Sequence, residues 1–244
     1  MHEHFKEVKW PLFVMIESMI KTIVFDLGGV VFAEGKTVAM QRLNEELGYD
    51  PKIISGIISS SQSEDMRRGL LSDEAFWQWV SRQVPRGYDV DRIQQAWYEG
   101  YVPDMDIFTL VSNLRGKYRL VIYSDNIKSR VEFIDHKHPF RSLFDAEVYS
   151  YEHHLIKTDI GFVDALLPVC QAESQEIVLI DDKEKAVTEA RDAGLNVLIY
   201  KRGEIEKLKT VLKDLGVLSN IYQVFLDRSV RVLRAGPSIR ICQP

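Results

Sequence analysis

Acidic and hydroxyl side chains directly follow three short apolar runs of this sequence. The runs and their following residues are Thr22 to Phe25 with Asp26, Leu120 to Tyr123 with Ser124, and Ile177 to Ile180 with the pair Asp181 and Asp182. Carboxylates can attack an electrophile or hold a divalent cation, and a hydroxyl can donate to an anion. Such residues also cap helices, which is the alternative for any one of them. Three coinciding segments favour a common site.

The apolar runs themselves predict a sheet that positions these side chains. Short β-branched runs, with Val197 to Tyr200 as a fourth, are typical of parallel strands buried on both faces. Helical patterns lie between them, for example Glu184 to Ala193 with Gly194 placed to end the helix. This alternation predicts an α/β fold with a doubly wound parallel sheet, which binds ligands beyond the carboxyl ends of its strands.

Residues 35–103 interrupt the alternation. They contain four helix-like stretches and three of the four tryptophans, Trp77, Trp79 and Trp97. Ser72 stands where a helix cap is expected, ahead of two acids and an apolar face at helical spacing. We expect a helical insertion over the mouth of the crevice, with its aromatic side chains packed in a core rather than stacked on a ligand.

Length and charge restrict the class of protein. A chain of 244 residues favours one domain with an insertion. The 31 basic and 36 acidic side chains give a net charge of -5, which argues against nucleic acid or an anionic membrane as partner and favours a small molecule. No run approaches the roughly 20 apolar residues of a membrane span.

The two cysteines, Cys170 and Cys242, are too few for a disulfide framework. We therefore expect a reduced, cytoplasmic protein with inert thiols.

Four segments resemble, in order, the motifs of the haloacid dehalogenase (HAD) superfamily of hydrolases. They are IVFDLGGVVF from Ile23 to Phe32, YSDN from Tyr123 to Asn126, SYEHHLIKTD from Ser150 to Asp159, and IVLIDDKEKAVTEARDAGL from Ile177 to Leu195. The segment RRGLLSDEAFW, Arg67 to Trp77, is similar to the helical C1-type cap of subfamily I. The Asp-Leu-Gly opening resembles that of glucose-1-phosphate phosphatase-like members.

This resemblance implies a division of the chain. Residues 19–34 and 104–218 would form the HAD-like, Rossmann-like core, and residues 35–103 the helical cap. Residues 1–18 would be an N-terminal extension, although a packed strand or helix is the alternative there. Residues 219–244 would be a C-terminal extension, in which Arg228, Arg231 and Arg234 form either a basic tail or a solvated face. The sequence carries no sign of the oligomeric state.

The resemblance also implies roles for individual residues. Asp26 would attack phosphorus and form an aspartyl phosphate. Mg²⁺ would be held by Asp26, the carbonyl of Gly28 and the acidic pair, with Asp182 as the ligand in preference to Asp181, which would hold Asp182 in place. The phosphate oxygens would be held by Ser124, Asn126 and Lys157. Without the surrounding motif, we would interpret Lys157 as a solvent-facing lysine in a loop.

Gly28 departs from the family pattern, because phosphatases of this type usually carry a general acid two positions after the nucleophile. A general acid is worth about 10²- to 10⁴-fold in rate. The expected substrate is therefore a sugar phosphate or another small phosphorylated metabolite with a weakly basic leaving group. Glu34, His153 and His154 are candidate substitutes that we leave outside the site. The alternatives are a weakly active or inactive ligand-binding or regulatory protein, and a dehalogenase-type hydrolase, against which the paired acids argue.

Overall fold

A five-stranded parallel sheet forms the centre of the molecule. The computed structural model describes residues 20–218, so the two predicted extensions, with Cys242, lie outside the described residues. The strand order is β3-β2-β1-β4-β5. The strands are β1 (Thr22–Phe25), β2 (Arg119–Ser124), β3 (Ala146–Tyr149), β4 (Ile177–Asp181) and β5 (Asn196–Ile199). The doubly wound α/β fold expected from the sequence is confirmed, and β1 lies between β2 and β4.

The strand boundaries differ slightly from the predicted ones. Ser124 and Asp181 are the last residues of β2 and β4 rather than the residues after them, and β5 begins and ends one residue earlier than predicted. The sequence analysis did not identify β3. This strand lies at the edge of the sheet, and only its last two residues, Val148 and Tyr149, are buried, so it lacks the continuous apolar run of the central strands.

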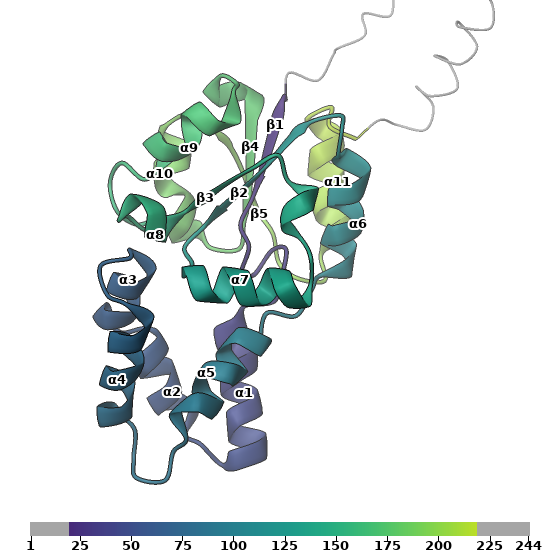
Figure 1. The fold of residues 1–244 in the computed structure, drawn as a ribbon. Coiled ribbons are helices and arrows are strands. Elements are labelled where there is room, and N and C mark those ends of the chain that lie inside the picture. The colour runs from purple at the N-terminus through teal and green to yellow at the C-terminus, as the bar shows by residue number, and fades with distance from the viewer. Residues whose placement is uncertain (1–19, 219–244) are drawn as a thin grey trace, which may run out of the picture.

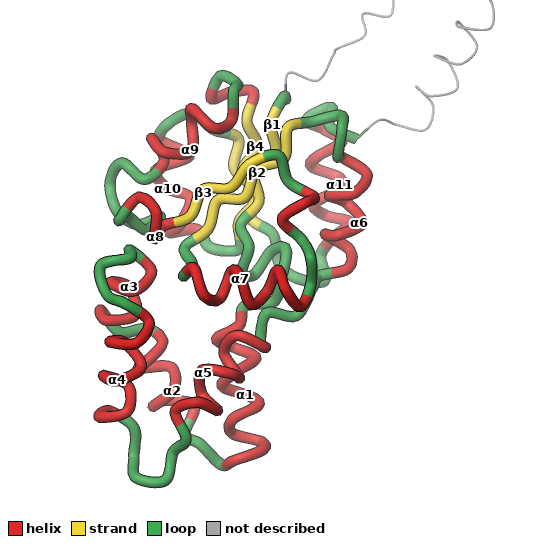
Figure 2. Tube along the Cα trace, viewed as in Figure 1, coloured by secondary structure: helices red, strands yellow, loops and turns green. Residues whose placement is uncertain are grey.

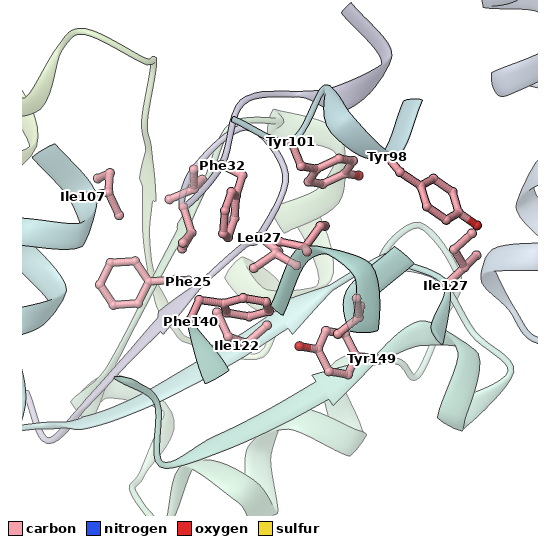
Figure 3. Packing of buried hydrophobic residues seen from close by; sticks show 14 of the residues in the cluster. Phe25, Leu27, Phe32, Tyr98, Tyr101, Ile107, Ile122, Ile127, Phe140 and Tyr149 are labelled. Carbon is pink, nitrogen blue, oxygen red and sulfur yellow. The ribbon is translucent and has the colours of Figure 1, made fainter. Parts of the chain in front are cut away.

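Successive side chains of β1 enter two separate cores. Ile23 and Phe25 belong to a large apolar cluster that also contains residues of the helices on that face, whereas Val24 belongs to a second cluster on the other face. The first face is covered by α6 (Met105–Leu114), α7 (Lys128–Lys137) and α11 (Ile205–Asp214), and the second by α9 (Val163–Cys170) and α10 (Thr188–Asp192). Figure 1 shows the two layers. Figure 3 shows that the first cluster continues from Phe25 and Phe140 to Tyr98 and Tyr101.

Five helices between β1 and α6 form a separate group beyond the carboxyl ends of the strands (Figures 1 and 2). They are α1 (Gly35–Leu47), α2 (Pro51–Ile58), α3 (Ser61–Arg67), α4 (Asp73–Gln83) and α5 (Val90–Glu99), and we call them the helical segment. The expectation of four helices was wrong, since the structure has five in this range. Two of the five, α2 and α3, are short. Ser72 caps α4 by accepting from the amide of Ala75 at 3.2 Å, as expected. Trp77 and Trp97 are buried and pack edge to face.

Short elements complete the fold. They are α8 (Ser150–His153) and three 3₁₀ turns, η1 (Arg141–Leu143), η2 (Ser174–Glu176) and η3 (Glu184–Val187). The helix predicted over Glu184 to Ala193 therefore begins as a 3₁₀ turn and becomes α-helical at Thr188. Cys170 is buried, and burial raises the pKa of its thiol to about 12, which keeps it protonated. Among residues 20–218 no helix combines the length and apolar character of a membrane span.

Polar contacts join α3 and α4 to the sheet end. Arg68 donates two hydrogen bonds to Asp159, from Nε and Nη2, at 2.7 and 2.8 Å. The hydroxyl of Ser150, at the end of β3, donates to the carbonyl of Arg67 at 2.7 Å. Ser129 of α7 donates to the carboxylate of Asp73. These contacts hold the helical segment against the strand ends.

Candidate active site

Three carboxylates lie together at the carboxyl ends of two neighbouring strands. Asp26 follows β1, Asp181 ends β4, and Asp182 follows it. One oxygen from each lies within 4.8 Å of the others. Asp26 and Asp181 are buried and Asp182 is half-buried. This grouping of hard oxygen donors is able to hold a divalent cation.

Lys157 lies between two of these carboxylates. Its Nζ is 2.8 Å from Oδ1 of Asp26 and 2.6 Å from Oδ2 of Asp181, and the side chain is only 3% exposed. Burial lowers the pKa of Lys157, but the neighbouring carboxylates outweigh burial and hold it above its usual value. The lysine therefore stays charged. Its backbone amide donates to Asp125 at 2.9 Å, which fixes the loop that carries it.

The two adjacent acids have different surroundings. Asp181 uses one oxygen for Lys157 and accepts the amide of Lys183 at 2.9 Å with the other. Oδ1 of Asp182 is buried and has no hydrogen-bond partner among the described residues. A buried oxygen without a partner is costly. Asp182 is therefore the member of the pair with a free ligand atom.

Crowding perturbs the acids. Burial and the Asp26 carboxylate raise the pKa of Asp182 to about 7, against a smaller lowering by Lys183. Burial also raises the pKa of Asp26, although the Lys157 ammonium opposes it. Both shifts have burial as their largest cause, so the charged forms of these two acids are costly in the absence of a further cation.

The loop after Asp26 approaches Asp182 so closely that only glycine fits. Gly29 has a φ of +95°, in the region that favours glycine, and a Cβ there would lie 2.3 Å from Cγ of Asp182. Asp182 is thus placed directly against the loop that carries Gly28 and Gly29.

Tyr101 occupies the space beside Gly28. A Cβ on Gly28 would lie 3.2 Å from Cε1 and 3.3 Å from the hydroxyl oxygen of Tyr101. The other edge of the ring faces Gly35, where a Cβ would lie 2.3 Å from Cε2. The ring is held between two glycines, so it has little room to move away from Gly28. Figure 3 shows Tyr101 beside Leu27.

Ser124 and Asn126 lie on either side of Asp125 at the end of β2, and both are buried. The Ser124 hydroxyl makes no hydrogen bond within residues 20–218, so it is free to donate to a ligand. Oδ1 of Asn126 accepts from the amide of Ile127 at 3.0 Å and from Nε of Arg130 at 2.8 Å. Its Nδ2 is buried without a partner in the described part of the chain.

The sequence analysis did not consider two arginines that lie near the end of β2, Arg67 and Arg130. Arg130 is the largest fully buried side chain, and its guanidinium lies 4.5 Å from the ring centre of Trp97 and 4.9 Å from that of Tyr101. Arg67 is the last residue of α3. Helix spacing does not connect Arg130 with Asn126, because Asn126 precedes the first residue of α7, so the sequence carries no clear signal for this contact.

The three candidate substitute proton donors are either held in an ion pair or exposed. Glu34 is bound to Lys183 at 2.9 Å. Burial raises the pKa of Glu34, but Lys183 and the Thr37 hydroxyl outweigh it and hold the pKa below its usual value. His153 and His154 are exposed, and His154 Nδ1 lies 2.8 Å from the carbonyl of Arg68.

No family model matches the chain. A putative uncharacterized protein of Dictyostelium discoideum is 34% identical over 222 residues, which cover 79% of this chain and 96% of the relative. A sesquiterpene phosphatase of Aspergillus oryzae is 25% identical over 180 residues, which cover 73% of this chain and 88% of that protein.

A solved structure with a similar fold is a HAD family enzyme of Bacteroides thetaiotaomicron in complex with magnesium and inorganic phosphate. It is 20% identical, covers 76% of this chain and 96% of its own, and superposes with a TM-score of 0.60. The sheet order, the placing of Asp26 and the position of the helical segment agree with the HAD motifs in the sequence. The chain therefore belongs to the same family as the Dictyostelium protein, and its fold is the one found in HAD-like hydrolases.

Proposed function

We propose that the protein is a Mg²⁺-dependent phosphatase of a small phosphorylated metabolite, acting in the cytoplasm through Asp26. The observation that carries the proposal is the buried Lys157 ammonium between Asp26 and Asp181, with the Asp182 carboxylate beside them. This arrangement combines an attacking group, a fixed positive charge and a cation site. The names of two similar proteins, a sesquiterpene phosphatase and an enzyme bound to magnesium and phosphate, support it.

The residues present fit a magnesium ion. Three carboxylates converge, one buried oxygen of Asp182 lacks a partner among the described residues, and burial together with the Asp26 carboxylate raises the pKa of Asp182. Asp26, Asp182 and the carbonyl of Gly28 would hold the ion, and Asp181 would support Asp182 and Lys157. Bound there, Mg²⁺ supplies positive charge to the phosphoryl oxygens.

The side chains of the site divide the remaining work. An oxygen of Asp26 forms a bond to phosphorus while the bond from phosphorus to the leaving oxygen breaks, and water later hydrolyses the aspartyl phosphate. Lys157 holds negative charge on the transferred group, and the free Ser124 hydroxyl donates to one of its oxygens. We assign residues 19–34 and 104–218 to the catalytic core and residues 35–103 to a cap that excludes water from it.

The leaving group must be weakly basic. Gly28 offers no proton, and the ring of Tyr101 fills the space in which an acid at this position would stand. An anomeric sugar oxygen is a weaker base than an ordinary alkoxide, so a sugar 1-phosphate satisfies this requirement. Alkyl phosphates do not, and we expect them to be poor substrates.

The metal site predicts a matched pair of thermal shifts. Mg²⁺ should raise the melting temperature of the wild-type protein, because an ion that binds only the folded state stabilises it by mass action. Asp182→Asn should remove most of this shift while leaving the metal-free melting temperature equal or higher, since one crowded carboxylate is lost. Asp192→Asn, at the end of α10, is the control and should keep the full shift. Equal shifts in both variants would place the ion elsewhere.

An aspartate introduced at position 28 is not expected to increase the rate of alkyl phosphate hydrolysis. Gly28→Asp should lower the melting temperature and leave turnover of an alkyl phosphate no faster, because its Cβ meets a ring that Gly35 keeps in place. Overpacking of this kind costs about 1–3 kcal/mol. Tyr101→Leu in the same chain should make the loss smaller than the sum of the two single changes. Faster alkyl phosphate hydrolysis by Gly28→Asp at unchanged stability would contradict this account.

The experiment that tests the function is phosphate release from a panel of sugar, nucleotide and acyl phosphates, with and without Mg²⁺. Asp26→Asn serves as the blank. Metal-dependent release above the blank supports the phosphatase, and the best substrate then identifies the metabolite class. Absence of phosphate release from every substrate would favour a ligand-binding protein, in which Gly28 accounts for the lost activity. Metal-independent halide release from haloacids would indicate a dehalogenase instead.

A further inference from the structure

Two arginines of the site have no carboxylate partner among residues 20–218. Arg130 is 1% exposed, and its only hydrogen bond in this part of the chain runs from Nε to the Asn126 amide oxygen, while Nη1 is buried without a partner. Nε of Arg67 is likewise buried without a partner. Buried charges in proteins are normally paired, because an unpaired one loses its hydration without compensation.

The charges of Arg67 and Arg130 act on each other. Burial lowers the pKa of Arg67 most, the Asp125 carboxylate opposes this, and the charge of Arg130 lowers the pKa further. The backbone holds them in this arrangement, because the Ser150 hydroxyl accepts from the Asn126 amide at 3.0 Å and donates to the Arg67 carbonyl at 2.7 Å. Two guanidinium groups with unpaired buried donor atoms can bind an anion, since the anion supplies the missing hydrogen bonds and weakens the repulsion between the two charges.

This pair borders the reacting carboxylate. Tyr101 contacts the Gly28 position two residues after Asp26 and lies under the Arg130 guanidinium at 4.9 Å. Asp125 provides a second connection, because its pKa, which burial raises to about 6, is lowered by Arg67 and raised by Asp26. The orphan amide nitrogen of Asn126 adds a third donor on the same side.

We propose that Arg67, Arg130 and Asn126 bind a second phosphoryl group of the substrate, next to the phosphoryl group that Asp26 attacks. This inference rests on the proposed phosphatase function and names its substrate class, of which a diphosphate ester is the simplest member. Planar guanidinium forks match phosphate oxygens in pairs, and Lys157 with Ser124 is left for the transferred group.

A diphosphate ester also removes the need for a general acid. Asp26 forms a bond to the terminal phosphorus, the bond from that phosphorus to the bridging oxygen breaks, and the electron pair leaves on a phosphate monoester. That leaving group is already a weak base, so no proton has to be supplied. The absence of a proton donor at Gly28, where Tyr101 fills the adjacent space, therefore does not slow the reaction of a diphosphate ester.

Binding tests the site without turnover. In the presence of saturating Mg²⁺, the wild-type protein should bind methylenediphosphonate about 10- to 100-fold more tightly than inorganic phosphate, the gain expected from one or two charge-assisted hydrogen bonds. Arg67→Gln should reduce this preference at least tenfold. Arg130→Lys, which keeps a cation over the two rings, should also reduce it because the fork is lost. Arg92→Gln, an exposed arginine of the helical segment, is the matched control and should retain the preference.

The specificity constants should change in the same variants that lose the binding preference. The ratio of kcat/KM for an alkyl diphosphate over the same alkyl monophosphate, and for glucose 1,6-bisphosphate over glucose 1-phosphate, should fall in Arg67→Gln and Arg130→Lys but not in Arg92→Gln. In the wild type, a larger ratio for the alkyl diphosphate indicates that the two phosphoryl groups of the substrate are adjacent. A larger ratio for the sugar bisphosphate indicates that they are separated. Equal affinities for the two probes, or unchanged ratios in both arginine variants, would overturn the subsite while the phosphatase stands. Preference for the diphosphonate without turnover of any substrate would support the subsite and contradict the phosphatase.

Discussion

Asp26→Asn should lower the rate of phosphate release by about 10⁴-fold or more, because the amide cannot attack phosphorus and no other group replaces a covalent nucleophile. Asparagine has nearly the size of aspartate and fits the same place between the end of β1 and Lys157. The loss should appear in kcat under saturating substrate and metal. Single-turnover measurements should show no phosphoryl-enzyme, whereas the wild type transfers its phosphoryl group to the protein.

The variant should remain folded, which separates loss of chemistry from loss of structure. The pKa of Asp26 is raised in the folded state, so the folded protein binds its proton more tightly than the unfolded chain does. The charged form therefore contributes a destabilisation that grows as pH rises above the ordinary aspartate value. Replacing it with a neutral amide should leave the melting temperature at neutral pH equal or higher.

A control at another aspartate completes this test. Asp50 caps α2 by accepting from the amide of Lys52, and asparagine caps a helix equally well. Asp50→Asn should keep both stability and turnover. Wild-type activity in Asp26→Asn, or loss of activity in Asp50→Asn at unchanged stability, would contradict the role of Asp26 as the attacking group.

The central strands could be predicted from the sequence because burial on both faces demands continuous apolar runs. In β1 all four residues are buried, and β4 is similar. The edge strand β3 was not predicted because its first two residues are only partly buried, so it lacks a continuous apolar run. The number of helices between residues 35 and 103 is harder to predict, because α2 and α3 are short and are separated only by Ser59 and Ser60, without glycine or proline.

The acidic cluster was expected from topology alone, since parallel strands bring their carboxyl ends to one edge. The structure places Asp26, Lys157, Asp181 and Asp182 together. The arginine pair could not be predicted, because whether a buried arginine has a partner depends on contacts between α3, α7 and the loop after β2. The contact of Tyr101 with Gly28 is equally invisible in the sequence, since it joins segments on either side of the helical segment.

Lys157→Met should abolish turnover and strongly destabilise the fold at neutral pH. The ammonium is nearly fully buried and bonded to both Asp26 and Asp181, so its removal leaves two buried carboxylates without a cation. Breaking a buried pair in this way costs about 3–5 kcal/mol. Urea unfolding of the metal-free protein at pH 7.5 should show this loss. Lys209→Met, which removes a lysine from an exposed ion pair on α11, is the control and should unfold as the wild type does.

The pH dependence gives this prediction a second, independent readout. Without the ammonium, burial and the Asp181 charge raise the pKa of Asp26 against only the smaller opposing charge of Lys183. Between the ordinary aspartate pKa of about 4 and the raised folded pKa of Asp26, the folded variant then binds more protons than the unfolded chain, so its stability must fall as pH rises through that interval. In the wild type the raised pKa of Lys157 keeps its contribution complete at every pH below about 10. The destabilisation by Lys157→Met should therefore be smaller at pH 5 than at pH 8. A loss of equal size at both values would mean that the methionine acts through packing, and that the ammonium does not hold the carboxylates in their charged form.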